Sequence, residues 1–281
     1  MNLKEALDRR AANPLLVLAG GTDFYPSLGD KSPPSDVIDT TGIKELQGIS
    51  VDASGWRIGA ACTWTELIKA ELPPVFDALK AAAREVGSVQ IQNAATIAGN
   101  LCNASPAADG VPPLLALDAQ VELASRRGRR ILPLAEFILG VRHTALADDE
   151  LLIAIHVPSQ SDDARSVFTK LGARRYLVIS IAMIAVTLVR HNGKISDARI
   201  AVGSCSPVAC RLEALESSIK GQELQALTAD AVSQIVWQAE LSELTPIDDV
   251  RGSANYRHQA VREMLARLLV DCAQQWENVS A

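Results

Sequence analysis

Two short segments rich in glycine and small polar residues are the parts of this sequence best suited to bind a ligand. They are residues 17–23, with the sequence VLAGGTD, and residues 95–100, with the sequence ATIAGN. Glycine lets backbone N–H groups approach an anion closely, because it has no Cβ to hold the ligand away. Neither segment has the spacing of a dinucleotide fingerprint or of a P-loop, so either one alone predicts only a structural turn.

The second segment continues into residues 100–109, whose sequence is NLCNASPAAD. Together with the first segment, this run resembles the flavin-binding subunit of the molybdenum hydroxylases, the group that contains xanthine dehydrogenase and carbon monoxide dehydrogenase. In that family an A-G-G-x-[SD]-like loop and a T-I-G-G-N loop hold the FAD pyrophosphate from two sides. The similarity continues through LLALDAQVEL, ELLIAIHVP at 150–158, Lys170 with Arg174, and DDVRGSANYR at 248–257. It therefore covers nearly the whole chain.

Two departures from the family pattern are visible. Ala98 stands where the second loop has its first glycine, which we expect to tighten the turn without removing its hydrogen-bond donors. The sequence also opens almost directly on NLKEALDRR, so a short leading strand common in the family is missing or truncated.

The resemblance implies a set of FAD-binding residues. They are Val17, Leu18, Ala19, Gly20, Gly21, Thr22, Asp23, Phe24, Val86, Thr96, Ile97, Gly99, Asn100, Ser105, Asp109, Leu152, Lys170 and Ile179. Asp109 suits hydrogen bonds from ribityl or ribose hydroxyls, and Lys170 near the ring would stabilise negative charge on reduced flavin. Without the resemblance, the residues alone favour Asp109 as a helix N-cap before Val111, and Lys170 as a solvent-facing strand residue.

The sequence offers no other convincing catalytic or metal-binding set. The four histidines have no metal-ligand spacing, and Ser105 lacks a nearby His/Asp pattern for hydrolysis. We therefore expect no catalytic side chain and no metal in this chain, with the chemistry carried by FAD. Residues 248–257 are explained by a helix start with charged caps, and we assign them no chemistry.

Composition and charge exclude several classes of protein. A net charge of −6 argues against a nucleic-acid surface, and the dense basic run at 126–130 predicts a solvated hairpin turn. The longest apolar run, 177–189, is interrupted by Ser180 and Thr187 and is too short for a membrane span. Five cysteines without a C-x-x-C pair predict reduced thiols, a cytoplasmic location and no iron–sulfur cluster in this chain.

Apolar periodicity predicts an α+β protein, because strands and helices are mixed in both halves. The expected strands are 15–19, 36–39, 56–60, 119–124, 151–157, 166–171, 178–190 and 198–203. The expected helices are 2–12, 63–69, 74–86, 111–117, 210–220, 228–241 and 255–275. We predict a two-subdomain FAD-binding domain over 1–158, of the PCMH/vanillyl-alcohol-oxidase type by resemblance. A smaller domain over 164–281, with a three-stranded antiparallel sheet and helices, follows it.

The resemblance implies an electron-transfer subunit that carries FAD. A molybdopterin-binding large subunit and a [2Fe-2S] small subunit would supply the molybdenum cofactor and the clusters, and NAD or another acceptor would take the electrons. A dimer of heterotrimers is the expected assembly. Two alternatives remain open: a self-sufficient flavin oxidoreductase, and a cofactor-free scaffold or assembly protein that keeps the fold.

Overall fold

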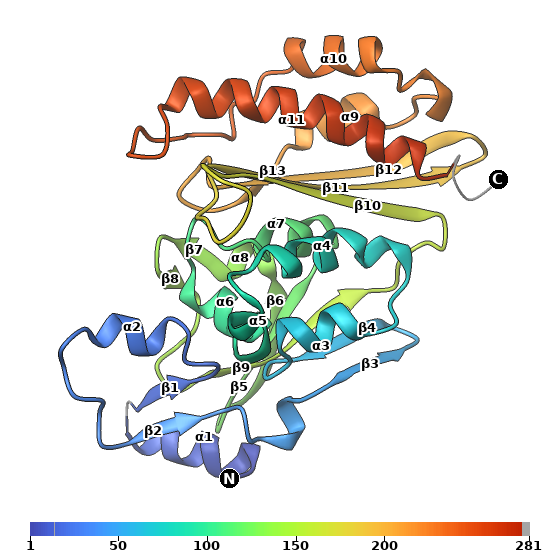
Figure 1. Ribbon diagram of the computed structural model, residues 1–281. Coiled ribbons are helices and arrows are strands. Elements are labelled where there is room, and N and C mark those ends of the chain that lie inside the picture. The colour runs from blue at the N-terminus through green and yellow to red at the C-terminus, as the bar shows by residue number, and fades with distance from the viewer. Residues whose placement is uncertain (14, 277–281) are drawn as a thin grey trace. The chain divides into compact units, whose positions relative to one another are not determined.

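The computed structural model describes residues 1–13 and 15–276, and the chain forms two compact units (Figure 1). Unit 1 consists of residues 1–70, 86–105 and 118–159. Unit 2 consists of residues 71–85, 106–117 and 160–281, of which the structure describes those up to 276. Each unit is therefore assembled from segments that lie far apart in the sequence, and the division into domains 1–158 and 164–281 remains a prediction.

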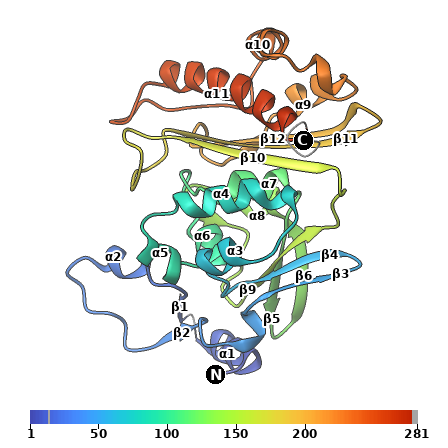
Figure 2. The same cartoon turned by 45° about the vertical axis from the view of Figure 1, so that its right-hand side comes forward.

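Unit 1 is built on a five-stranded sheet with the strand order β3-β4-β9-β5-β6, in which all neighbours are antiparallel (Figure 2). Its strands are β3 (Ile49–Asp52), β4 (Gly55–Gly59), β5 (Gln120–Ser125), β6 (Gly128–Pro133) and β9 (Leu151–Pro158). The smaller pairs are parallel β1 (Leu16–Leu18) with β2 (Val37–Asp39), and antiparallel β7 (Ile138–Gly140) with β8 (His143–Thr144).

The helices of unit 1 are short. They are α1 (Leu3–Ala12), α2 (Phe24–Leu28), α3 (Trp64–Lys69), α5 (Val89–Ala94), α6 (Ile97–Asn103), α8 (Leu134–Phe137) and the 3-10 helix η1 (Lys44–Leu46). The capping box predicted at Thr63 is confirmed: the Thr63 hydroxyl accepts from the Glu66 N–H, and the Glu66 carboxylate accepts from the Thr63 N–H at 2.7 Å.

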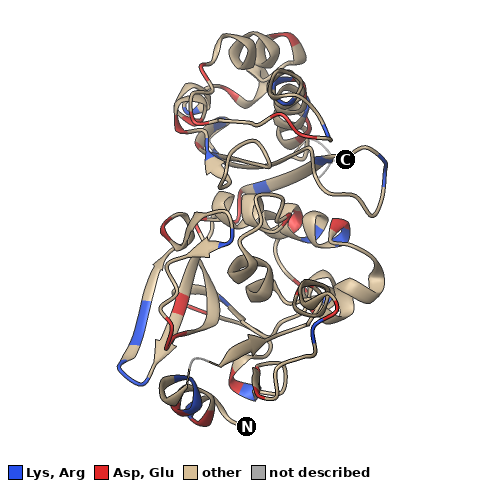
Figure 3. Cartoon of the chain, turned by 90° about the vertical axis from the view of Figure 1, so that its left-hand side faces the viewer, with Lys and Arg blue, Asp and Glu red and all other residues tan. Residues whose placement is uncertain are grey.

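The basic run at 126–130 forms the turn of the β5–β6 hairpin, as predicted, and its charges stand out in blue in Figure 3. Each arginine of the run is paired with a carboxylate. The pairs are Arg126–Asp8, Arg127–Asp149, Arg129–Glu122 and Arg130–Glu150, at 2.7–3.3 Å. Ion pairs therefore neutralise the positive charge of this hairpin.

Unit 2 has an antiparallel sheet with helices on both of its faces (Figure 1). The strands are β10 (Ala164–Leu171), β11 (Ala182–His191), β12 (Lys194–Gly203) and β13 (Cys210–Arg211). One face carries η2 (Pro74–Phe76), α4 (Asp77–Glu85) and α7 (Val111–Ala116). The rest of the unit includes α9 (Glu213–Ile219), η3 (Leu224–Ala226), α10 (Ala229–Gln238) and α11 (Ala254–Gln274), with α11 on the other face. Because both faces are covered, β11 is buried from residue 182 to residue 188 without alternation.

The predicted mixed α+β class, the antiparallel C-terminal sheet and the following helices are confirmed, with three local differences. Cys210 and Arg211 pair with β12 as a fourth strand instead of starting a helix. Residues 178–181 are irregular, so β11 begins at Ala182, and residues 97–103 are helical rather than a loop. Asn192 and Gly193 form the predicted turn between β11 and β12, with φ angles of 51° and 79°. No helix within residues 1–13 and 15–276 is long and apolar enough to span a membrane.

Ser166 on β10 fixes the start of α4 in unit 2. Its buried hydroxyl donates to the Val75 carbonyl at 2.7 Å and accepts from the Ala78 N–H at 2.9 Å. We predict that Ser166→Ala lowers the free energy of unfolding by about 1–3 kcal/mol, because two buried backbone groups lose their partner. Ser196→Ala, which removes an exposed hydroxyl from the same sheet, should change it little. Urea unfolding of both variants measures the difference, and equal stability of the two would contradict the assignment.

Candidate functional site

The first glycine segment is the turn between β1 and α2. Gly21 has φ +74°, a conformation that side chains with a Cβ rarely adopt, so glycine is required there. The backbone then enters α2, whose Phe24 packs edge-on against Tyr25. Residues 20–23 thus lie between β1 and α2, and their backbone N–H groups take part in neither element.

Gly20 brings the first segment into direct contact with the second. A Cβ built on Gly20 would lie 1.9 Å from the Ala94 carbonyl oxygen and 2.7 Å from the Cα of Ala95. A Cβ on Gly99 would lie 3.6 Å from the Cβ of Ala19. The two segments that the sequence singled out therefore lie against each other within unit 1, and only glycine at position 20 permits so close a backbone approach.

The second segment differs from the expected open loop. Thr96 is the N-cap of α6, and its hydroxyl accepts from the Gly99 N–H at 3.0 Å. The N–H groups of Ile97 and Asn100 donate to the carbonyls of Cys62 and Thr96, both at 3.1 Å. Ala98 sits inside this helix, where alanine is favoured, so it tightens no turn. The N–H groups of Ile97, Gly99 and Asn100 are thus already engaged, whereas the Oδ1 atom of the Asn100 side chain is buried without a partner in the described chain.

Unit 1 contains a group of polar atoms that lack partners of their own. Among residues 1–13 and 15–276, the backbone N–H groups of Gly20, Gly21, Thr22 and Asp23 donate to no acceptor. The buried Oδ1 atom of Asn100 has no hydrogen-bond partner in that part of the chain either. Residues 20–22 are half-buried and Asp23 is exposed, so these donors are accessible to a ligand. Consecutive N–H groups on a glycine turn that donate to no protein acceptor are typical of an anion-binding cradle. These residues fit a diphosphate.

Two residues that the sequence did not single out hold this turn in place. The Asn103 amide donates to the Asp23 carboxylate at 3.0 Å, and the Arg142 guanidinium donates to the Asn103 side-chain oxygen. Arg142 also donates its backbone N–H to the Ala104 carbonyl at 2.9 Å. Asn103 lies within NLCNASPAAD, so its place in that run was the available signal. Nothing in the sequence pattern marked Arg142.

Unit 2 holds a buried cluster around Asp109. The Lys170 ammonium and the Ser180 hydroxyl each donate to one Asp109 carboxylate oxygen, both at 2.6 Å. The Lys170 ammonium also donates to the Glu85 carbonyl at 3.4 Å. The side chains of Lys170 and Asp109 are 6% and 9% exposed, so Lys170 is not the solvent-facing strand residue of the alternative reading. Asp109 is not an N-cap either: Gly110 holds that position, without a side-chain cap.

Burial dominates the electrostatics of this cluster. It raises the pKa of the Asp109 carboxyl above its ordinary value, although the Lys170 ammonium and the Ser180 hydroxyl act in the opposite direction. Both partners therefore favour the ionised form of the carboxyl, against the effect of burial. Sequence reasoning missed Ser180 as a cluster member, and the available signal was its interruption of the apolar run 177–189.

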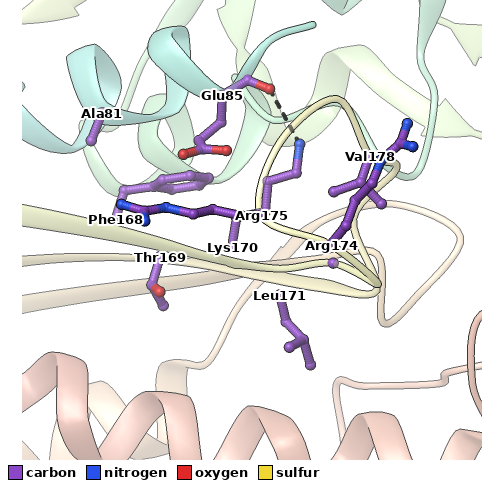
Figure 4. Close-up of a pocket in the computed structure, with 10 residues that line it drawn as sticks. Ala81, Glu85, Phe168, Thr169, Lys170, Leu171, Arg174, Arg175 and Val178 are labelled. Carbon is purple, nitrogen blue, oxygen red and sulfur yellow. Dashed lines mark hydrogen bonds between the residues drawn. The ribbon is translucent and has the colours of Figure 1, made fainter.

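A pocket of about 400 Å³ opens beside Lys170 in unit 2 (Figure 4). Its wall includes the apolar side chains of Phe168 and Val178 and the charged side chains of Lys170 and Arg174. Lys170 is held by Asp109, and the Arg174 guanidinium donates to the Leu177 carbonyl at 3.2 Å. Arg175 also lines the pocket, and its guanidinium lies 5.2 Å from the centre of the Tyr176 ring. Since all three cations have partners within the unit, the pocket offers no evidence for a ligand other than the proposed cofactor.

The remaining predicted residues fall in different environments. Leu152 on β9 is buried in unit 1, and Val86 there is half-buried. Ser105 is half-buried just after α6. Ile179 belongs to the irregular segment before β11 in unit 2 and is 54% exposed. Their contact with a cofactor remains a prediction.

The buried pair gives a pH-dependent prediction for Lys170→Met. Removing one partner of a buried ion pair costs about 3 kcal/mol or more of unfolding free energy. A carboxyl whose pKa is higher in the folded state favours folding at low pH and opposes it as pH rises through that pKa. Because losing the ammonium raises the Asp109 pKa further, the loss should be larger at pH 8 than at pH 5.

Urea unfolding at the two pH values measures this effect. Lys194→Met is the matched control, because Lys194 pairs with Glu223 at 3.2 Å and both side chains are more than half exposed. An exposed pair contributes little, so the control should lose little stability at either pH. A Lys170→Met penalty that grows on acidification would contradict the assigned role of the pair.

Comparisons with known proteins agree with this geometry. Residues 1–160 match the family described as FAD binding domain in molybdopterin dehydrogenase, and residues 168–272 match the CO dehydrogenase flavoprotein C-terminal domain. The chain is 32% identical over 272 residues to the xanthine dehydrogenase FAD-binding subunit of Escherichia coli O157:H7, covering 95% of this chain and 92% of that one. It is 30% identical over 258 residues to the carbon monoxide dehydrogenase medium chain of Hydrogenophaga pseudoflava, covering 90% and 87%.

A solved structure agrees as well. The fold superposes on a chain of a carbon monoxide dehydrogenase structure from Hydrogenophaga pseudoflava with a TM-score of 0.87 and 29% identity, covering 98% of this chain and 95% of that one. The family match spans more than half of the chain, and the similarity to curated relatives covers nearly all of it. The chain therefore belongs to the FAD-binding subunits of the molybdenum hydroxylase family, the oxidoreductases of the xanthine dehydrogenase and carbon monoxide dehydrogenase type.

Proposed function

We propose that the turn at residues 20–23 holds the FAD pyrophosphate. The observation that carries this proposal is the run of four backbone N–H groups without an acceptor in the described chain, on a turn that requires Gly21. The Thr22 hydroxyl and the Asn100 side chain are further groups available to a ligand in unit 1. In unit 2, Asp109, Lys170 and Ile179 remain the candidates for cofactor contact, and in unit 1 so do Val86 and Leu152.

FAD, when bound, supplies redox chemistry that accepts electrons from one centre and passes them to another. The chain's own part is to bind the cofactor and orient it. We propose that electrons reach this subunit from [2Fe-2S] clusters in a small subunit, after oxidation of a substrate at a molybdenum cofactor in a large subunit. NAD or another acceptor then takes them. The named relatives support this role, since they are described as subunits or chains of dehydrogenases.

The proposed assembly is a cytoplasmic dimer of heterotrimers. Closed two-fold symmetry is the commonest solution for oligomers of this kind. The five cysteines are free thiols, which suits a reducing compartment.

The complex isolated from its own cells tests the function directly. Acid denaturation and filtration should release FAD, and the native complex should contain iron and molybdenum together with this chain. Rapid mixing of the substrate-reduced complex with NAD should reoxidise the flavin if NAD is the acceptor. A monomer that turns over its own substrate without iron or molybdenum would favour a self-sufficient oxidoreductase. A native complex without bound flavin would favour a scaffold protein.

Gly20 gives a residue-level prediction for FAD binding. We expect Gly20→Ala to weaken FAD binding by about tenfold or more, equivalent to about 1.4 kcal/mol. The physical reason is the contact of 1.9 Å between the new Cβ and the Ala94 carbonyl oxygen, which the backbone must relieve by moving the turn. Titration of the FAD-depleted complex with FAD measures the dissociation constant.

Gly42→Ala is the matched control. Gly42 has no positive φ, and a Cβ built on it meets no atom within 4 Å. We expect its FAD affinity to stay within about twofold of the parent. If Gly20→Ala bound FAD as tightly as Gly42→Ala, the turn at residues 20–23 would not be the pyrophosphate site.

A further inference from the structure

Arg257 is a buried cation at the end of DDVRGSANYR, in the first turn of α11. Its residue is 3% exposed, and one guanidinium nitrogen donates to the Asp249 carboxylate at 2.7 Å. The other terminal nitrogen donates to the carbonyls of Ile181 and Ser204, the latter at 3.0 Å. The Nε atom of Arg257 is buried and has no hydrogen-bond partner in the described chain. Burying a guanidinium is costly, so this placement indicates a specific role.

The carboxylate partner of Arg257 is itself fixed. The Asp249 carboxylate accepts from the backbone N–H of Arg251 at 2.8 Å, and the Arg251 guanidinium lies 2.9 Å away. These hydrogen bonds, together with that of Arg257, hold the pKa of Asp249 at about 2. The Asp249 carboxylate is therefore ionised throughout the physiological range, and it accepts a hydrogen bond from the Arg257 guanidinium within the same segment, residues 248–257.

The Arg257 guanidinium contacts the last residue of the loop between β10 and β11, which spans residues 172–181. Ile181 closes this loop: its N–H donates to the Leu171 carbonyl at 2.7 Å, and its carbonyl accepts from Arg257, 76 positions along the chain. Antiparallel strands usually need only two to five connecting residues, so a longer irregular loop that is anchored in this way is typical of a functional segment.

The anchored loop carries exposed apolar side chains and backbone strain. Tyr176, Leu177 and Ile179 are 61%, 55% and 54% exposed. Leu177 has φ +51°, which is unfavourable for a residue with a Cβ and persists only where the surroundings impose it. Arg174 supplies one such constraint by donating to the Leu177 carbonyl, and the anchor at Ile181 supplies another.

The base of the loop also reaches the buried cluster. Ser180 immediately precedes the residue that Arg257 holds, and its hydroxyl donates to Asp109, which in turn pairs with Lys170. A shift of Ile181 would move Ser180 and remove one of the two groups that favour the ionised form of Asp109. The contacts thus run from Arg257 through Ile181 and Ser180 to the Asp109–Lys170 pair.

We propose that Arg257 is a positioning residue for the cofactor: by holding the Ile181 carbonyl it fixes loop 172–181, and so keeps Ser180 on Asp109 and Ile179 in its exposed place. This inference rests on the proposed function, in which Asp109, Lys170 and Ile179 contact FAD. Arg257 itself touches no reacting group.

The test uses the complete complex with Arg257→Gln, which removes the charge while keeping a polar side chain. FAD affinity should fall about tenfold, as is usual when a group supporting a ligand contact is lost. Amide hydrogen exchange of residues 172–182 should speed up, and the visible circular dichroism of bound FAD should change. Arg257→Lys, which keeps the charge and one donor group, should recover part of all three signals.

Arg262→Gln is the matched control. Arg262 lies on the same helix and also donates to two backbone carbonyls, but those belong to Val236 and Trp237 at the end of α10. It should cost stability without altering FAD affinity or exchange in the loop. If Arg257→Gln and Arg262→Gln gave the same FAD affinity and the same loop exchange, the proposal would be overturned.

Two further outcomes are informative. If Arg257→Gln does not assemble, Ser180→Ala breaks the same chain of contacts at its last step, and an unchanged FAD affinity there would also contradict the proposal. If the unaltered complex binds no FAD, the proposed function fails. In that case loop exchange still reports whether Arg257 anchors residues 172–181.

Discussion

The ammonium of Lys170 is buried, and much of unit 2 is arranged around satisfying it. An ammonium in this position is tolerable only with a carboxylate in contact and further hydrogen bonds, because desolvation otherwise outweighs any local attraction. Asp109 supplies the carboxylate and the Glu85 carbonyl supplies an acceptor. These partners come from the ends of α4 and the approach to α7, which explains why segments 71–85 and 106–117 pack with the C-terminal sheet. The ion pair thus links three separate stretches of chain within one unit.

In unit 1 the turn at residues 20–23 contrasts with this satisfied cluster. The N–H groups of residues 20–23 have no acceptor in the described chain, whereas those of Ile97, Gly99 and Asn100 in α6 donate to Cys62 or Thr96. A turn that requires glycine at positions 20 and 21, yet leaves its own donors open, is arranged for a ligand rather than for folding. Asp23, Asn103 and Arg142 then keep that arrangement rigid, which lowers the ordering cost of binding.

The sequence predicted those parts of the fold that depend on local chemistry. Thr63 with Glu66 marked a helix start, and Asn192-Gly193 marked a hairpin, because each pattern satisfies or adapts its own backbone. Residues 97–103 form a helix and not the predicted loop, because Thr96 caps its start by accepting from the Gly99 N–H. The predicted strand 178–190 begins four residues before β11 does. Residues 178–181 are mostly apolar, as in a strand, but long-range contacts hold them in an irregular conformation. Ser180 and Ile181 are held by Asp109 and Arg257, neither of which lies near them in sequence.

Those long-range contacts also give residues 248–257 a use in a redox subunit, although the segment carries no reactive group. FAD carries the reaction, so the protein's influence lies in where its contact groups are held. Residues 248–257 contain no group suited to electron or proton transfer, and a helix cap accounts for their local structure. Yet the helix they begin delivers one guanidinium to the carbonyl of Ile181, and Ser180 beside it completes the coordination of Asp109. Arg257 lies on α11, a 21-residue helix that packs against the buried strand β11. The position of the loop 172–181 therefore depends on the core of the unit. The loop strained at Leu177 is thus constrained from within by Arg174 and from outside by Arg257.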